Sequence, residues 1–233
     1  MVDAGLTCKE LARRLAEVQL TPKDISAVIV THEHQDHIRG IGVLSRRYRI
    51  PIYMNAATSE AVRTYVDEVP TAEIFSTGDL LTMGNLTLQT YPVLHDAAEP
   101  IGLTVQNSSC RIGIALDMGY PTHLVKQRLQ HSSVLILEFN HDPEMLRRCS
   151  RPWEVKQRIL SKTGHMSNGD ALELLCELLH DRLLAVVLAH LSREANCPRH
   201  VHKLVSERLK EVGRSDIEIC VSAQDEVSKP IIA

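Results

Sequence analysis

The sequence lacks several features that would place it in familiar classes of protein. Its six cysteines include no CxxC pair, and no charged-then-apolar leader stands at its start. We therefore expect free thiols in a reducing, cytoplasmic setting. The apolar runs are much shorter than the ~20 residues of a membrane-spanning helix, so no membrane partner is expected. The formal net charge of −3 excludes an overall positive field that would attract polyanions, and any such contact must be local.

Internal repeats, low-complexity blocks and linkers are also missing, and proline and glycine are scattered rather than clustered. The chain has 233 residues, of which 44% are hydrophobic. This is enough for one substantial core, so we expect a single domain over residues 1–233.

Short apolar runs alternate with amphipathic segments along the chain. Thr7 and Glu10 have the spacing of a capping box and predict a first helix. The run 27–31 is short and β-branched, as in a buried strand, and it ends at His32. Further strands are predicted at 51–54, 86–90, 103–105, 112–116, 134–138, 185–189 and 217–221, and helices at 56–66 and 201–212. This order predicts an α/β fold with two sheets sandwiched between helices.

The segment from His32 to His37 places three histidines and two acids within six positions. Such a group is unfavourable to desolvate unless it binds something, and a metal is the simplest partner. Imidazole and carboxylate without thiolate suit Zn, Mn or Fe(II). The alternative is a solvated polar loop with incidental histidines. His95, Asp117 and His190 all follow predicted strands, where loops carry functional groups on a rigid scaffold, and this favours the metal site.

These residues resemble the five ligand motifs of the metallo-β-lactamase superfamily, in the order His32-x-His34-x-Asp36-His37, His95, Asp117 and His190. The segments 91–97, 116–119, 137–146, 164–168 and 188–192 resemble the YycJ/WalJ branch, which is nuclease-like and related to ribonuclease J and ribonuclease Z. The resemblance implies a four-layer αβ/βα sandwich.

It also implies two divalent metals, zinc or manganese with iron as a further option. His32, His34 and His95 would hold one metal, Asp36, His37 and His190 the other, and Asp117 would bridge them around a hydroxide. Lactamases of the superfamily typically have cysteine at the position of Asp117, so this chain resembles the phosphodiesterases and thioesterases instead.

His165 resembles the histidine of the Gly-His-x-Ser element in ribonuclease J-like enzymes. That histidine contacts the scissile phosphate and is suited to protonate the leaving oxygen, so Asp36 and His165 are the expected catalytic residues. The alternative is that His165 merely precedes a helix capped by Ser167.

Several residues are expected to support this site. Glu138, Asn140 and His141 end a predicted strand and would either face the metals or lie at the surface. Asp3 resembles a family residue that braces the histidine loop, the alternative being an ordinary turn residue. A basic stretch is predicted to follow the phosphates of a nucleic acid or to be a solvated helix face; it consists of Arg147, Arg148, Arg151, Lys156, Arg158 and Lys162, with Trp153 among them. A second group, Arg39, Arg46, Arg47 and Arg49, follows the histidine loop and carries less weight.

Two departures from the family shape the functional prediction. Family members usually begin with a β-hairpin before the Asp3 element, and we expect it to be absent here. The stretch between Asp117 and His165 is too short for the inserted domain that ribonuclease J-like enzymes use for RNA. We therefore predict a metal-dependent phosphodiesterase, a DNA exonuclease. The alternatives are a glyoxalase II-like thioester or small-ester hydrolase and an inactive metal-binding protein. Metal identity, DNA against RNA, polarity and oligomeric state stay open.

Overall fold

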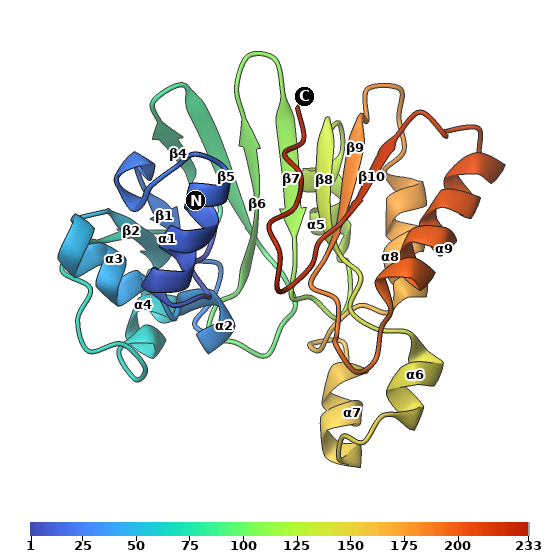
Figure 1. Cartoon of the computed structure of the whole chain (residues 1–233), viewed down its shortest axis with the longest axis horizontal. Helices are drawn as coiled ribbons and strands as arrows, with labels where there is room; N and C mark the ends of the chain where they lie inside the picture. The colour runs from blue at the N-terminus through green and yellow to red at the C-terminus, as the bar shows by residue number, and fades with distance from the viewer. Residues whose placement is uncertain (233) are drawn as a thin grey trace. The chain divides into compact units, whose positions relative to one another are not determined.

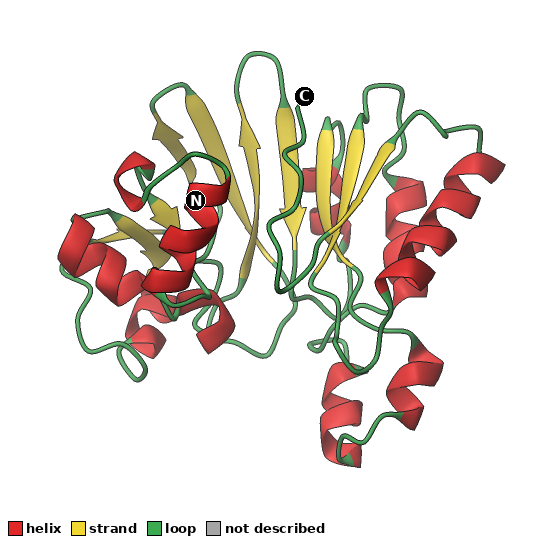
Figure 2. Cartoon of the chain, viewed as in Figure 1, coloured by secondary structure: helices red, strands yellow, loops and turns green. Residues whose placement is uncertain are grey.

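The computed structural model describes residues 1–232, and the chain forms two compact units (Figures 1 and 2). Unit 1 consists of Met1–Asp79 and Ala97–Ile101, and unit 2 consists of Leu80–Asp96 and the chain from Gly102 onward. Both mix helices with strands, so the α/β class is confirmed. The expectation of a single domain over residues 1–233 stays a prediction.

Unit 1 contains a parallel sheet of β1 (Val28–Ile29), β2 (Ile52–Asn55) and β3 (Ala72–Phe75). Its helices are α1 (Cys8–Glu17), the 3₁₀ helix η1 (Pro22–Asp24), α2 (Gln35–Ile38), α3 (Ile41–Tyr48) and α4 (Ala56–Val62). Apolar side chains from the strands and from α2, α3 and α4 share one core: Val28, Ile38, Ile41, Leu44, Ile52, Met54 and Val62. The apolar residues that predicted the strands therefore also fill this core.

The start of α1 shows how local chemistry sets an element. The Thr7 hydroxyl accepts a hydrogen bond from the amide of Glu10 at 3.3 Å, as the predicted cap requires. The Glu10 carboxylate accepts from Arg13 and Arg14 instead of completing the capping box. The predicted helix is confirmed, and Glu10 takes part in ion pairs on the surface of that helix.

Unit 2 contains a seven-stranded sheet in the order β10-β9-β8-β7-β6-β5-β4. The strands are β4 (Leu80–Met83), β5 (Leu86–Pro92), β6 (Ile101–Gln106), β7 (Arg111–Ala115), β8 (Val134–Glu138), β9 (Ala185–Ala189) and β10 (Glu218–Val221). The strands β7 to β10 are parallel, whereas β4 pairs with β5 and β6 pairs with β7 in antiparallel fashion. The carboxyl ends of β7, β8 and β9 therefore lie at one edge of the sheet.

Three helices cover one face of this sheet: α5 (His123–Leu129), α8 (Asn168–Glu177) and α9 (Pro198–Glu211). They share a core with alternate residues of the strands, such as Leu135 and Leu137 of β8. Figure 1 shows α6 (Pro143–Arg148) and α7 (Trp153–Ile159) beyond the edge at which β8 ends. Within residues 1–232, no helix combines the length and the apolar character needed to cross a membrane.

Candidate metal centre

The histidine loop of unit 1 lies between β1 and α2, with His34 as the N-cap residue of α2. The rings of His32 and His34 have centroids 4.6 Å apart, and those of His32 and His37 lie 4.1 Å apart. His32 and His37 are buried, whereas Asp36 is exposed. The loop thus gathers three imidazoles beside one carboxylate on a short, well-packed segment.

Asp3 holds this loop in place. Its carboxylate accepts hydrogen bonds from the Thr31 amide at 2.8 Å, from the Thr31 hydroxyl at 2.9 Å and from Nδ1 of His37 at 2.8 Å. Its backbone is left-handed, with φ 53°, so the short segment before α1 turns the carboxylate towards the loop. Thr31, which we did not predict as a site residue, also contacts Nδ1 of His32 at 3.0 Å. Its position immediately before the first histidine was the available signal.

Only glycine fits at position 5, beside the histidine loop. A Cβ atom at position 5 would lie 1.5 Å from the carbonyl oxygen of Asp36, so any side chain would displace the backbone of the loop. The segment from Asp3 to Gly5 therefore packs directly on the histidine loop.

In unit 2, the ends of three parallel strands bring a second set of groups together. Asp117 follows β7, Glu138 ends β8 and His190 follows β9. Ala115 is in register with Leu137, and Glu138 with Ala189, so the three side chains lie at one level of the sheet edge. The parallel register therefore brings together three side chains that are far apart in the sequence.

Asp117 and His190 have left-handed backbones, with φ of 50° and 57°. This conformation costs about 1–2 kcal/mol for a residue with a Cβ. Strain of this kind at strand ends is typical of functional positions, where the surrounding structure holds a side chain in a required direction.

Glu138 is the hub of this cluster. Its side chain is fully buried and accepts from Nδ1 of His165 at 2.7 Å and from Nδ1 of His190 at 2.9 Å. It also accepts from the backbone amides of Met118 at 3.0 Å and Met166 at 3.3 Å. Burial alone raises the pKa of the Glu138 carboxyl, but the bonds from the two histidines outweigh it and hold that pKa below its usual value.

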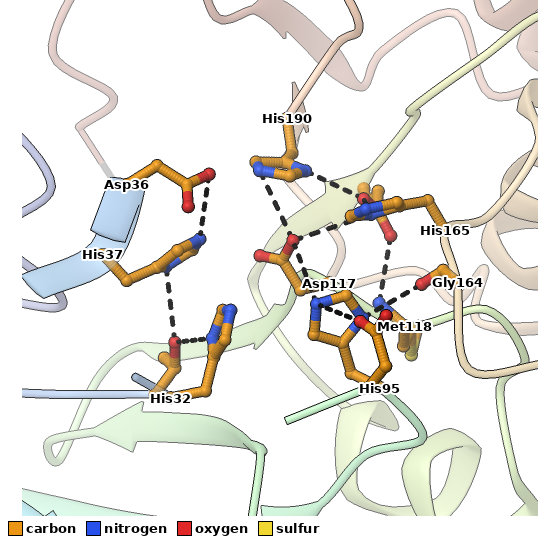
Figure 3. A network of polar contacts seen from close by, with 12 residues as sticks. His32, Asp36, His37, His95, Asp117, Met118, Gly164, His165 and His190 are labelled. Atoms are coloured by element: carbon orange, nitrogen blue, oxygen red, sulfur yellow. Dashed lines mark hydrogen bonds and ion pairs between the residues drawn. The ribbon is translucent and has the colours of Figure 1, made fainter. Parts of the chain in front are cut away.

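Asp117 is surrounded by three histidines of unit 2 (Figure 3). Nε2 of His190 lies 3.4 Å from Oδ1 of Asp117, Nδ1 of His165 lies 3.6 Å from it, and Nε2 of His95 lies 4.0 Å from it. The ring of His165 is 5.1 Å from that of His95 and 5.4 Å from that of His190. Burial lowers the pKa of His95 and favours its neutral form, which is the form that binds metals.

The donor chemistry of both units fits divalent metals. Nδ1 of His37 donates to Asp3, Nδ1 of His190 to Glu138, and Nδ1 of His95 to the carbonyl of Gly164 at 3.1 Å. A ligand histidine usually donates its second ring N–H to a carboxylate or carbonyl in this way, which leaves Nε2 as the ligand atom. Within unit 2, one ligand atom from each of four side chains lies within 4.8 Å of the others: Asp117, Glu138, His165 and His190.

Asn140 and Ser167 support the cluster in different ways. Asn140 donates to Oε1 of Glu138 at 3.3 Å and to the carbonyl of His190 at 3.0 Å, so it ties the ends of β8 and β9 together. Ser167 caps α8, where its hydroxyl accepts from the amide of Asp170 at 3.2 Å. The predicted cap is therefore confirmed. His165 bonds to Glu138 as well, and its contact with a scissile phosphate stays a prediction.

His141 is 1% exposed, so the alternative of surface placement does not hold for it. Its two ring nitrogens have no hydrogen-bond partner among residues 1–232, and burial lowers its pKa. Its carbonyl accepts from Asn168 at 2.8 Å. Asn196, which carried no signal in the sequence, donates to the carbonyls of Phe139 and Asn140 and so fixes the segment after β8.

Three of the six cations in the basic stretch, which runs from Arg147 in α6 to Lys162 beyond α7, pair with acids. Arg147 pairs with Glu144, Arg158 with Asp96, and Arg151 with Glu194 at 3.4 Å. Nζ of Lys162 lies 5.7 Å from the centroid of the Tyr120 ring. Arg148 and Trp153 are exposed. The stretch therefore presents much less unbalanced charge than its composition indicated.

Lys156 differs most from the expected exposed cation. It is 8% exposed, and its ammonium donates to the carbonyls of Arg147 at 2.8 Å and Cys149 at 2.7 Å. These carbonyls lie at the end of α6, where the helix dipole favours a cation. Lys156 joins α6 to α7, so its position argues against the predicted contact with substrate.

Replacing Lys156 with methionine is expected to destabilise the protein by about 1–3 kcal/mol, because two buried carbonyls lose their donor. Urea unfolding measures this, and Arg148→Met, which removes an exposed cation of the same pair of helices, is the control. Unchanged stability together with weakened DNA binding would instead support the substrate role of Lys156.

Comparisons with known proteins agree over most of the chain. Residues 1–190 match the beta-lactamase superfamily domain. The exodeoxyribonuclease YycJ of Bacillus anthracis is 38% identical over 215 residues, which cover 91% of this chain and 81% of that protein. The exodeoxyribonuclease WalJ of Streptococcus pneumoniae is 35% identical over 213 residues, covering 90% and 79%. The crystal structure of the metallo-β-lactamase fold protein YhfI from Bacillus subtilis has a TM-score of 0.70 at 20% identity, covering 95% of this chain and 82% of that one. The last similarity shows a shared fold.

Proposed function

This chain belongs to the β-lactamase superfamily, and we propose that it acts there as a metal-dependent exonuclease on DNA. Two relatives that match about nine-tenths of the chain are named exodeoxyribonucleases. Asp117, rather than a cysteine, supports phosphodiester over lactam hydrolysis. The six unpaired thiols suit a reducing compartment, and we infer a cytoplasmic location from them.

The proposed metal centre takes ligands from both clusters. His32, His34 and His95 would hold one metal, Asp36, His37 and His190 the other, and Asp117 both. The support is the family motif, the orientation of the Nδ1 atoms towards protein acceptors, and the choice of imidazole and carboxylate donors, which suits Zn or Mn. Two adjacent cations lower the pKa of bound water and neutralise charge on the oxygens of a phosphodiester.

The residues of the chain supply the remaining chemistry. His165 donates its Nδ1–H to Glu138, so its Nε2 would face the leaving oxygen and would protonate it when the ring is an imidazolium. Glu138 would position His165 and His190 together through one carboxylate oxygen. The single observation that carries the proposal is this buried Glu138, which joins a proposed proton donor to a proposed metal ligand.

Cleavage of end-labelled DNA with added Mn or Zn tests the proposal. The wild type is expected to release nucleotides from a strand end, and Asp36→Ala is expected to lose about 10²-fold or more of this activity, because it removes a proposed ligand. Asp181→Ala is the control: it removes an exposed carboxylate in the turn before β9, at the end of that strand opposite His190. Absence of cleavage by the wild type, or equal cleavage by Asp36→Ala, would reject the proposal.

A further inference from the structure

The segment that follows the histidine loop is rich in arginine and has no acids. From His37 to Ser59 the sequence contains four arginines, Arg39, Arg46, Arg47 and Arg49, and no aspartate or glutamate. All four are exposed. This segment is therefore locally cationic, although the formal net charge of the chain is −3.

None of these four arginines has a carboxylate partner among the residues that the structure describes. The guanidinium of Arg46 is already engaged within the chain, because it donates to the carbonyl of Glu68 at 2.8 Å. Arg47 lies with its guanidinium 5.4 Å from the centroid of the neighbouring Tyr48 ring. The acids of nearby α1 are already occupied, since Glu10 and Glu17 pair with Arg13. We call Arg39, Arg47 and Arg49 the arginine stripe.

The three arginines of the stripe follow the histidine loop in the sequence, at the ends of α2 and α3. Arg39 stands two residues after His37, at the end of α2, and its backbone is helical. Arg47 comes eight residues later, in the last turn of α3, a separate helix that begins at Ile41. The C-terminal end of α3 also favours cations and offsets part of their mutual repulsion.

Arg49 adds a second, independent observation. It ends α3 in a left-handed conformation, with φ 57°, at the position where glycine is the usual residue. The conformation is strained for any residue with a Cβ, and no ion pair of the Arg49 side chain compensates for it within residues 1–232. Arg49 is also exposed, so its guanidinium is accessible to a ligand from solution.

We propose that the arginine stripe binds the phosphates of the nucleic-acid strand that is being degraded, next to the histidine loop. This inference rests on the proposed nuclease function and names the surface that holds the substrate. It also differs from the prediction that α6 and α7 follow the phosphates, because most cations there are paired with acids or with backbone carbonyls.

Fluorescence anisotropy with a labelled 20-nucleotide single strand and metal-free full-length protein tests the inference. The double variant Arg47→Ala/Arg49→Ala is expected to bind about five- to twentyfold more weakly at ~0.1 M salt. The slope of log K against log salt is expected to fall by about 0.7 per lost contact, or roughly 1.4 in all. The control, Arg182→Ala/Lys210→Ala, removes two exposed cations elsewhere and is expected to keep the wild-type slope.

Arg49→Gly separates binding from folding. It removes the side chain and relieves the left-handed strain, so the thermal midpoint is expected to rise by roughly 2–4 °C while binding weakens. An unchanged salt slope in both stripe variants, or an equal loss in the Arg182/Lys210 control, would overturn the inference.

The two proposals can fail separately. Wild-type protein that binds the strand through the stripe but never cleaves it with added metal contradicts the nuclease function alone. Protein that cleaves DNA with a salt slope unaffected by the stripe variants contradicts the stripe alone. Stripe variants that instead change the elution volume of the protein in size-exclusion chromatography, with unchanged DNA binding, would assign the surface to a second copy of the chain.

Discussion

Replacing Glu138 with glutamine is expected to reduce DNA hydrolysis about 10- to 100-fold, the usual effect of losing a group that orients metal ligands. The carboxylate accepts from His165, from His190 and from two backbone amides. A glutamine keeps one carbonyl oxygen and introduces an NH₂ group, which donates and cannot accept. The variant therefore loses acceptors for part of this network although its shape is nearly unchanged.

The measurements should separate positioning from simple destabilisation. The pH–rate profile, the metal content and the thermal midpoint of Glu138→Gln are compared with those of Glu207→Gln, which alters an exposed carboxylate on α9. A positioning role predicts lower kcat, a changed pH profile and weaker metal retention in a folded protein. Wild-type kcat in Glu138→Gln would remove Glu138 from the mechanism.

Metal removal is expected to produce the second large effect. Several proposed ligands are buried, including His32 at 1%, Asp117 at 4% and His37 at 5% exposure, so a metal that they bind stabilises the folded chain. A ligand present at ~1,000 times its Kd contributes about 4 kcal/mol, and each kcal/mol shifts the midpoint of a chain of this size by about 2–4 °C. Chelation is therefore expected to lower the thermal midpoint by about 8–16 °C, and added Zn or Mn to restore it.

Two histidine variants make the result specific. His37→Ala removes a proposed ligand and is expected to lose most of the metal-dependent shift, whereas His202→Ala, exposed on α9, is expected to keep it. Differential scanning calorimetry with and without metal measures both. Identical midpoints for the wild type in chelator and in added metal would contradict a metal centre of this chain.

The sequence by itself determined the elements and the candidate ligands. β-branched runs are found as β8 and β9, and residues placed at predicted strand ends lie at real strand ends, as Asp117 and His190 do. Such patterns are local, because a strand or a helix is specified by the spacing of apolar residues within a few turns. The histidine loop needed no more than six consecutive positions to be recognised.

Only the tertiary structure decided which polar groups act together. Parallel register brings Glu138 beside His190, and the loop after α7 brings His165 to the same carboxylate. The brace from Asp3 reaches His37 across 34 positions, and burial makes Lys156 a link between helices instead of the expected substrate contact. The tertiary structure also reversed the weight of the two basic groups. Three cations near Trp153 pair with acids, whereas Arg47 and Arg49 have no carboxylate partner among residues 1–232. The pairing of charges and hydrogen bonds depends on distances between segments far apart in the chain, and local periodicity contains no information about those distances.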